Sequence, residues 1–345
     1  MKFLKQLTET PGVSGREERV RELIRNHTKG WWDRLEEDHI GNLIGFVKAA
    51  KSRRGQKEKS VMISCHIDQI GFYVRSIDKD GFLRINPAGG FDTRNLFARR
   101  VIVQAAKGDL PGILNPATKP VHLATPEERK KIPTIGEFAV DLGLPADRVK
   151  KLVKPGDPVV LEQTTRKVGN LVCGQAMDNR ISPWVALSAI KQAKGKNIYD
   201  IHFIGSAQEE VGLRGAHVVA QNVKADVGIA VDVTLAVDTP RVYEEEMVSR
   251  VGGGVAIKVM DSSVISTRSL FEEFVALAER EKIKYQYEVL PMGGTDTSAL
   301  QRFGPGRRVI CLSVPTRYVH TVVEAVHMDD LKAAAKLLAA WLMGK

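Results

Sequence analysis

The pattern of apolar and polar positions between residues 198 and 220 predicts the central element of the chain. The apolar run at 201–204 ends in small residues, the adjacent glutamates Glu209 and Glu210 follow, and a second apolar segment begins after Gly215. Such a pattern predicts a strand, a tight turn and a helix. The glutamate pair is then expected at the end of a strand, where open α/β sheets bind their ligands.

Strand-like and helix-like segments also alternate near both ends of the chain, which indicates an α/β domain. The expected helices are residues 2–9, a helix capped by Ser14 and Glu17, a helix with Pro183 in its first turn, residues 269–282, and a C-terminal helix from about Asp329. The expected strands lie near residues 38–48, 61–65, 226–234, 255–260, 285–290 and 308–314.

The pattern changes between about residues 72 and 164, where short alternating segments are separated by Gly and Pro. This pattern is typical of a small all-β unit. Because the α/β pattern resumes afterwards, and the first α/β part is too short to close a sheet, we expect an inserted β-barrel-like domain at 72–164. Residues 1–71 and 165–345 would then form one α/β domain.

Composition narrows the class of protein. Of the 345 residues, 43% are hydrophobic and 27% are charged, which is typical of a soluble globular protein. The first residues lack the apolar core of a signal peptide, no run is long enough to cross a membrane, and three scattered cysteines do not form a disulfide framework. We therefore expect a cytoplasmic protein with free thiols and no membrane contact.

The net charge of +10 raises the alternative of a nucleic-acid partner. The basic residues are spread along the chain, however, and the densest cluster, Lys51 to Lys59, has no aromatic residues between its charges for base stacking. A solvated hairpin or loop tip is the favoured interpretation of this cluster. We expect no nucleic-acid binding.

Seven acidic or imidazole side chains follow predicted strands or open predicted helices. In a doubly wound sheet such positions meet at one edge. Two imidazoles and several carboxylates are suitable ligands for divalent metals, but one tetrahedral zinc would not need so many. A site with two metal ions, in which one further carboxylate acts as a base, accounts for the set better. The candidates are His66, Asp68, Asp178, Glu209, Glu210, Asp232 and His320.

Several of these candidates also have a purely structural interpretation. His66 could be a structural histidine beside a core strand, Asp178 could be a helix N-cap, and the glutamate pair could be solvated in a helix's first turn. Thr295 or Asp296 could likewise cap the next helix. The coincidence of ligand types at several strand ends favours the metal site.

Taken together, the motifs resemble the tetrahedral (TET-type) aminopeptidase family of dinuclear metallo-exopeptidases. The similarity covers nearly the whole chain and is carried by TPGVSGREERVRE, CHIDQIGFYV, FDTRNL, PEERKK, AMDNR, SAQEEVGLRGA, VDVT, GGTDTSALQ and PTRYVHT. Two positions depart from the common family pattern, because SAQEE replaces a TVQEE-like form and Gln69 replaces a frequent Glu.

The resemblance implies a mixed β-sheet with helices on both faces and an inserted β-domain. It also implies two divalent ions per subunit, zinc by preference and cobalt or manganese otherwise. His66 and Asp232 would bind one ion, Glu210 and His320 the other, and Asp178 both. Asp68 would orient His66.

Glu209 would be the base that deprotonates a metal-bound water, giving the hydroxide that hydrolyses N-terminal residues from short peptides. The alternative is a metal-dependent amidase or deacylase acting on non-peptide substrates. Family members form dimers and often hollow dodecamers, so we expect self-association. Related enzymes carry a cis peptide after the bridging aspartate, which predicts one at Asp178–Asn179.

Overall fold

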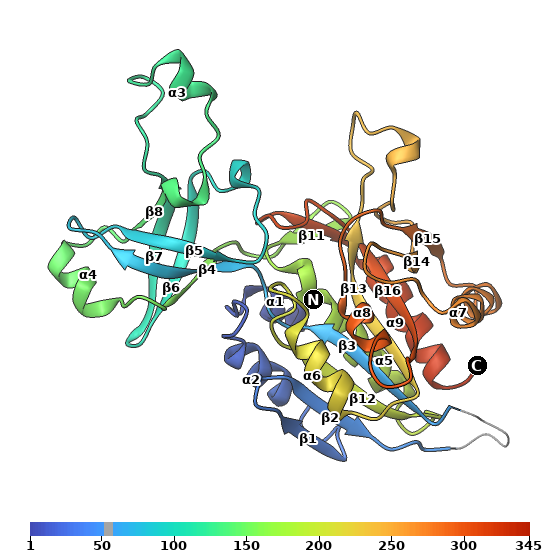
Figure 1. Cartoon of the computed structure of the whole chain (residues 1–345). Coiled ribbons are helices and arrows are strands. Elements are labelled where there is room, and N and C mark those ends of the chain that lie inside the picture. The colour runs from blue at the N-terminus through green and yellow to red at the C-terminus, as the bar shows by residue number, and fades with distance from the viewer. Residues whose placement is uncertain (52–57) are drawn as a thin grey trace.

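The computed structural model describes residues 1–51 and 58–345, which form a large α/β sheet and a separate barrel (Figure 1). The basic cluster at 51–59 falls mostly on residues 52–57, outside the described residues. The helices of the described chain are α1 (Lys2–Glu9), α2 (Glu18–His27), α3 (Pro126–Lys130), α4 (Ala146–Leu152), α5 (Met177–Ala193), α6 (Arg214–Asn222), α7 (Arg268–Arg280), α8 (Asp296–Gln301) and α9 (Met328–Leu342).

The main sheet is mixed, and within the described residues it has eleven strands. Its central strands β12, β3, β13 and β16 are parallel, while β2 and β17 pair antiparallel beside them. The sheet strands are β1 (Arg34–Glu37), β2 (Leu43–Val47), β3 (Ser60–His66), β10 (Arg166–Val168), β11 (Leu171–Gly174), β12 (Asp200–Ser206), β13 (Val227–Leu235), β14 (Val255–Met260), β15 (Tyr285–Val289), β16 (Arg308–Arg317) and β17 (Glu324–His327).

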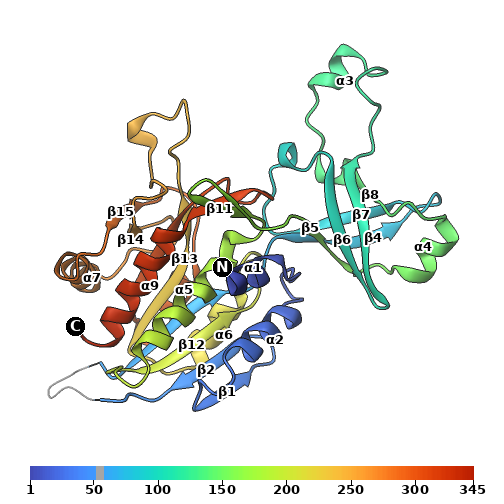
Figure 2. The ribbon, with the colours of Figure 1, turned by 180° about the vertical axis from the view of Figure 1, so that it is seen from behind.

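Helices cover both faces of this sheet, as Figure 1 and the opposite view in Figure 2 show. Apolar residues of α1, α5, α7 and α9 pack on one face in the largest core cluster, and α6 and α8 contribute Val219 and Leu300 to a smaller cluster on the other. Strands buried on both sides need apolar residues at nearly every position, which explains the continuous run in β13. The predicted mixed α/β class is confirmed.

The inserted unit leaves the sheet after β3 and returns before β10. Its six strands form a closed antiparallel barrel in the order β4-β5-β8-β7-β6-β9, with its own core around Phe72, Val103 and Phe138. The barrel strands are β4 (Gly71–Ile77), β5 (Leu83–Ala88), β6 (Arg99–Ala105), β7 (Gly108–Pro116), β8 (Phe138–Asp141) and β9 (Pro158–Leu161). The expected barrel-like insertion is therefore confirmed as a fold.

Two local predictions were wrong. The strand expected near 38–48 is shorter, because Asp38 Oδ1 accepts backbone N–H groups of Ile40, Gly41 and Asn42 and forms a turn between β1 and β2. The capping box of Ser14 and Glu17 does not form either. Ser14 donates instead to Asp68, and Glu17 accepts the backbone N–H of Gln208, so α2 has no side-chain cap.

The structure also bears on the cysteines and on the question of a membrane-spanning helix. All three cysteines are free, and Cys65 and Cys311 are buried, whereas Cys173 is partly exposed. Among the described residues, no helix is long and apolar enough to cross a membrane.

Candidate metal centre

The carboxyl ends of β3, β12 and β13 bring the predicted residues together. His66 is the last residue of β3, in register with Ser206 at the end of β12, and Asp232 lies toward the end of β13. The His66 ring is buried, and its Nε2 atom lies 3.2 Å from Asp178 Oδ1 and 3.8 Å from Asp232 Oδ1. His66, Asp178 and Asp232 thus offer three ligand atoms within 4.8 Å of one another.

Asp178 also belongs to a second group of three, with Glu210 and His320. Its Oδ2 atom lies 3.4 Å from His320 Nε2, and the same nitrogen lies 3.4 Å from Glu210 Oε2. Asp178 does not cap α5, because the N-cap residue is Ala176 and the Asp178 carboxylate faces His66 and His320. The predicted cis peptide at Asp178–Asn179 is present.

The glutamate pair lies in a turn, and α6 begins only at Arg214. The side chains of Glu209 and Glu210 are 11% and 6% exposed, so the alternative of a solvated helix start is wrong. Glu209 Oε2 lies 3.8 Å from His66 Nε2, yet Glu209 is in neither ligand group. Glu210 therefore belongs to a ligand group, whereas its neighbour Glu209 does not.

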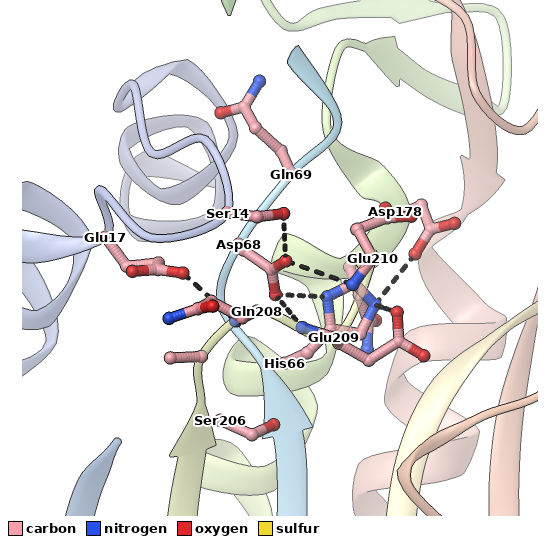
Figure 3. A network of polar contacts seen from close by, with 12 residues as sticks. Ser14, Glu17, His66, Asp68, Gln69, Asp178, Ser206, Gln208, Glu209 and Glu210 are labelled. Atoms are coloured by element: carbon pink, nitrogen blue, oxygen red, sulfur yellow. Dashed lines mark hydrogen bonds and ion pairs between the residues drawn. The ribbon is translucent and has the colours of Figure 1, made fainter. Parts of the chain in front are cut away.

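Four consecutive backbone amides of this turn, from Ala207 to Glu210, donate to buried side chains. Asn42 Oδ1 accepts from Ala207. Glu17 Oε1 accepts from Gln208, and the two carboxylate oxygens of Asp68 accept from Glu209 and Glu210 (Figure 3). Amides beyond a strand end have no ladder partner, and burial without one is costly. These contacts fix the backbone that carries both glutamates.

Asp68 connects this turn to the imidazole. Its Oδ1 atom lies 3.3 Å from His66 Nδ1, and its Oδ2 accepts the Ser14 hydroxyl at 2.6 Å. The pKa of Asp68 is lowered, because hydrogen bonds from His66 and Ser14 outweigh the opposing effect of burial. Through these contacts, Ser14 holds the Asp68 carboxylate and Glu17 holds the turn that carries the two glutamates.

The charges of the centre depend on one another. Burial raises the pKa of Glu209 and Asp232 well above the usual range of carboxyl groups. Burial lowers the pKa of His320, but the carboxylates of Asp178 and Glu210 outweigh it and raise that pKa to about 11. So many buried acidic groups around two imidazoles favour the presence of cations.

A cavity of about 240 Å³ opens over these groups. Apart from the acidic side chains and the two histidines, the described lining of the cavity is neutral and mostly apolar. The neutral lining residues are Val233, Thr234, Leu235, Leu290, Met292, Gly293, Gly294, Thr295 and Val319. The arrangement suits a small substrate with one end at the acidic cluster.

Comparison with known proteins identifies the family. The sequence profile of the M42 glutamyl aminopeptidases matches residues 41–337. A putative aminopeptidase from Acetivibrio thermocellus is 37% identical, with 97% of this chain and 96% of that protein covered. The chain belongs to the M42 glutamyl aminopeptidase family.

Solved structures agree with this M42 assignment. An aminopeptidase from the archaeon Desulfurococcus kamchatkensis is 33% identical and superposes with a TM-score of 0.93, covering 100% of this chain and 94% of the other. The TET1 peptidase of Pyrococcus horikoshii, which can assemble into a tetrahedron or a large octahedral shell, is 30% identical with a TM-score of 0.87, at 99% and 98% coverage. The fold is that of the TET aminopeptidases.

The residues present in this M42 chain fit the metal ions that its family implies. Glu210 Oε1 is buried and has no hydrogen-bond partner among the described residues, as expected of an atom that faces a cation. Two imidazoles and three carboxylates are also a suitable donor set for borderline divalent ions. No described cysteine belongs to either ligand group.

Sequence inspection missed several supporting residues. Glu324 accepts backbone hydrogen bonds from Asp178 and His320, and burial together with Asp178 raises its pKa to about 8. Asp296 accepts the hydroxyls of Ser64 and Ser206 behind His66. Thr295, not Asp296, caps α8. An acidic residue within an apolar segment was the available signal for Glu324, since such burial needs a partner.

Buried Arg180 is a further residue that sequence inspection missed. Its guanidinium donates to the carbonyls of Leu7, Thr10 and Gly12 and to Gln69 Oε1. Gln69 is therefore a neutral acceptor for this arginine. The departure from the family pattern leaves all candidate ligands in place.

Proposed function

We propose that this protein is an aminopeptidase that holds two divalent ions and uses Glu209 as its general base. The observation that carries the proposal is that two groups of potential ligands share Asp178, while the Glu209 carboxylate lies 3.8 Å from His66 and is part of neither group. One carboxylate between two ion sites is the arrangement that a dinuclear hydrolase needs. Membership of the aminopeptidase family supports the reaction.

In this proposal the residues have separate tasks. His66 and Asp232 would hold one ion, Glu210 and His320 would hold the other, and Asp178 would serve both. Asp68 would fix the orientation of the His66 ring, because its carboxylate lies beside Nδ1. When bound, the two ions polarise the scissile carbonyl and make water more acidic.

The chain's own groups complete the reaction. Glu209 takes a proton from the attacking water on its carboxylate and delivers it to the leaving nitrogen. Its raised pKa, caused first by burial, is suited to this exchange. The acidic groups around the centre bind the free α-amine of the substrate, which limits cleavage to the first residue.

Removal of metal tests the proposal against its main alternative. Dialysis against a strong chelator is expected to abolish hydrolysis of aminoacyl-p-nitroanilides, and added zinc, cobalt or manganese is expected to restore it. The metal giving the highest rate then identifies the preferred ion. Hydrolysis of N-acylated amides in preference to substrates with a free α-amine would instead favour a metal-dependent amidase or deacylase.

The lining of the cavity predicts a preference for neutral, apolar N-terminal residues. Leu235, Leu290 and Met292 line it, and among the described lining residues there is no Lys or Arg to pair with an acidic substrate side chain. Burying an unpaired charge is costly. We expect kcat/KM for leucyl and methionyl p-nitroanilides to exceed that for glutamyl ones by at least about 10-fold, equivalent to about 1.4 kcal/mol.

A charge added at the cavity mouth tests this explanation. Met292 is 75% exposed and lines the cavity, so Met292→Arg is expected to raise the glutamyl-to-leucyl ratio of kcat/KM without unfolding the protein. Val168→Arg, at an exposed apolar position on β10 outside the cavity lining, is the matched control and is expected to leave the ratio unchanged. Equal rates for glutamyl and leucyl substrates in the unmodified enzyme would contradict the preference.

We also propose that residues 1–71 and 165–345 form the catalytic domain and that the insert at 72–164 mediates self-association. The insert projects from the main sheet (Figure 2) and exposes Ile113, Leu123 and Ile132. Exposed apolar groups of this kind often mark interfaces. A solved relative that is 31% identical is described as a dodecamer, and the Pyrococcus horikoshii TET1 peptidase as able to form a tetrahedron, which supports a dodecamer here.

Light scattering at micromolar concentration tests the assembly. The expected mass is at least twice the 38.1 kDa of one chain, with the dodecamer as the main species. A monomer under these conditions would contradict the proposed role of the insert. The cytoplasmic location stays a prediction.

A further inference from the structure

Glu324 lies where two distant parts of the candidate centre meet. It is the first residue of β17 and pairs with Gly174, the last residue of β11, from which the chain continues toward Asp178. On its other side, the chain before β17 carries His320. The side chain is buried, with 2% of the residue exposed.

Both carboxylate oxygens of Glu324 are used, each by a different segment. Oε2 accepts the backbone N–H of Asp178 at 3.0 Å, and Oε1 accepts the backbone N–H of His320 at 2.7 Å. Both distances are those of direct hydrogen bonds, and each oxygen serves a different segment. One side chain thus joins the backbones of two residues from the ligand group formed by Asp178, Glu210 and His320.

The two segments need such support, because neither follows a favourable backbone path. His320 has a φ of 63° and Ala176, two residues before Asp178, has a φ of 52°, so both are in the left-handed region. This region is unfavourable for residues with a Cβ atom and persists where the surroundings enforce it. A bond to a buried carboxylate is a specific restraint on both segments.

We propose that Glu324 is a positioning residue that fixes Asp178 and His320 at the separation required to hold an ion between them and Glu210. The inference rests on the proposed dinuclear function. Both hydrogen bonds of Glu324 go to backbone amides, so it acts through the two ligands and does not contact the substrate.

Glu324→Gln tests the proposal with little change in size. The amide group has one acceptor oxygen, so only one of the two backbone N–H groups keeps its partner. We expect affinity for one ion to fall about 10–100-fold, the range typical for partners that orient metal ligands. The other ion should be affected less, because His320 belongs to only one of the two ligand groups. Competition with a fluorescent chelator measures both affinities.

Asp330→Asn provides a matched control. Asp330 is also a buried carboxylate that accepts two backbone N–H groups, from Gly252 at 2.6 Å and Gly254 at 2.8 Å, but it lies outside the cavity lining. Both variants are expected to lower the melting temperature. Only Glu324→Gln is expected to weaken ion binding, and high metal concentration should recover part of its activity.

Glu324→Asp keeps the carboxyl group on a shorter side chain and provides a second measurement if the Gln variant does not fold. Its affinity for the ion is expected to lie between those of the wild type and Glu324→Gln. Wild-type affinity for both ions in either folded variant, with only a lower melting temperature, would overturn the positioning role. A wild type that binds no divalent ion would overturn the proposed function itself, and this inference with it.

Discussion

Glu209→Gln is expected to retain two divalent ions per chain and to lose about 10²–10⁴-fold in kcat, the usual contribution of a general acid or base. Glutamine keeps the size and hydrogen-bonding reach of the side chain but cannot accept the proton. Glu209 belongs to neither ligand group, so ion binding should be unchanged. Metal analysis of the purified variant together with single-substrate kinetics measures both effects.

A second glutamate supplies the control for this result. Glu22→Gln changes an exposed carboxylate on α2, whose side chain is 62% exposed, and is expected to leave rate and metal content unchanged. The Glu209 assignment would be wrong if Glu209→Gln kept a near-normal kcat. Loss of an ion in this variant would instead make Glu209 a ligand.

Glu210→Gln is expected to lose an ion and, with it, most of the activity under ordinary metal concentrations. Glu210 Oε2 lies 3.4 Å from His320 Nε2, and its other oxygen is buried without a partner among the described residues. Loss of a residue that only orients a metal ligand typically weakens ion binding about 10–100-fold. Loss of a direct ligand should weaken ion binding by at least as much. High metal concentration should restore part of the rate, because the base remains in place.

The comparison between the two adjacent variants decides their roles. In Glu209→Gln, added metal should not restore the rate, whereas in Glu210→Gln it should. If Glu210→Gln kept two ions while Glu209→Gln lost one, the two assignments would be reversed. Two ions and normal rates in both variants would contradict the dinuclear mechanism altogether.

The local pattern of the sequence was sufficient for most secondary structure and for the candidate residues. Continuous apolar runs identify buried strands such as β13, and polar residues at their ends are rare enough to be noticed. Since the carboxyl ends of parallel strands share one edge of a sheet, His66 and Asp232 could be expected together without coordinates. The resemblance of motifs supplied the cis peptide and the ligand set, which periodicity cannot provide.

Local pattern misled where a side chain had a distant partner. Ser14 and Glu17 have the spacing of a capping box, but their hydrogen bonds go to Asp68 and to the amide of Gln208. A buried acceptor that would otherwise remain unsatisfied competes successfully with a local cap, because an unpaired buried group is costly. No spacing rule within one helix can anticipate that competition.

The sequence by itself determined which residue types stand at the strand ends, because burial on both faces of a sheet imposes a readable apolar pattern. Periodicity could not decide how those side chains group, which the resemblance implied and the tertiary structure decided: Asp178 is shared by two sets, and Glu209 is in neither. The tertiary structure also decided the place of Glu324, which depends on the antiparallel pairing of β11 with β17. Such contacts join residues far apart in the chain, so they depend on strand order and register, which local periodicity does not encode.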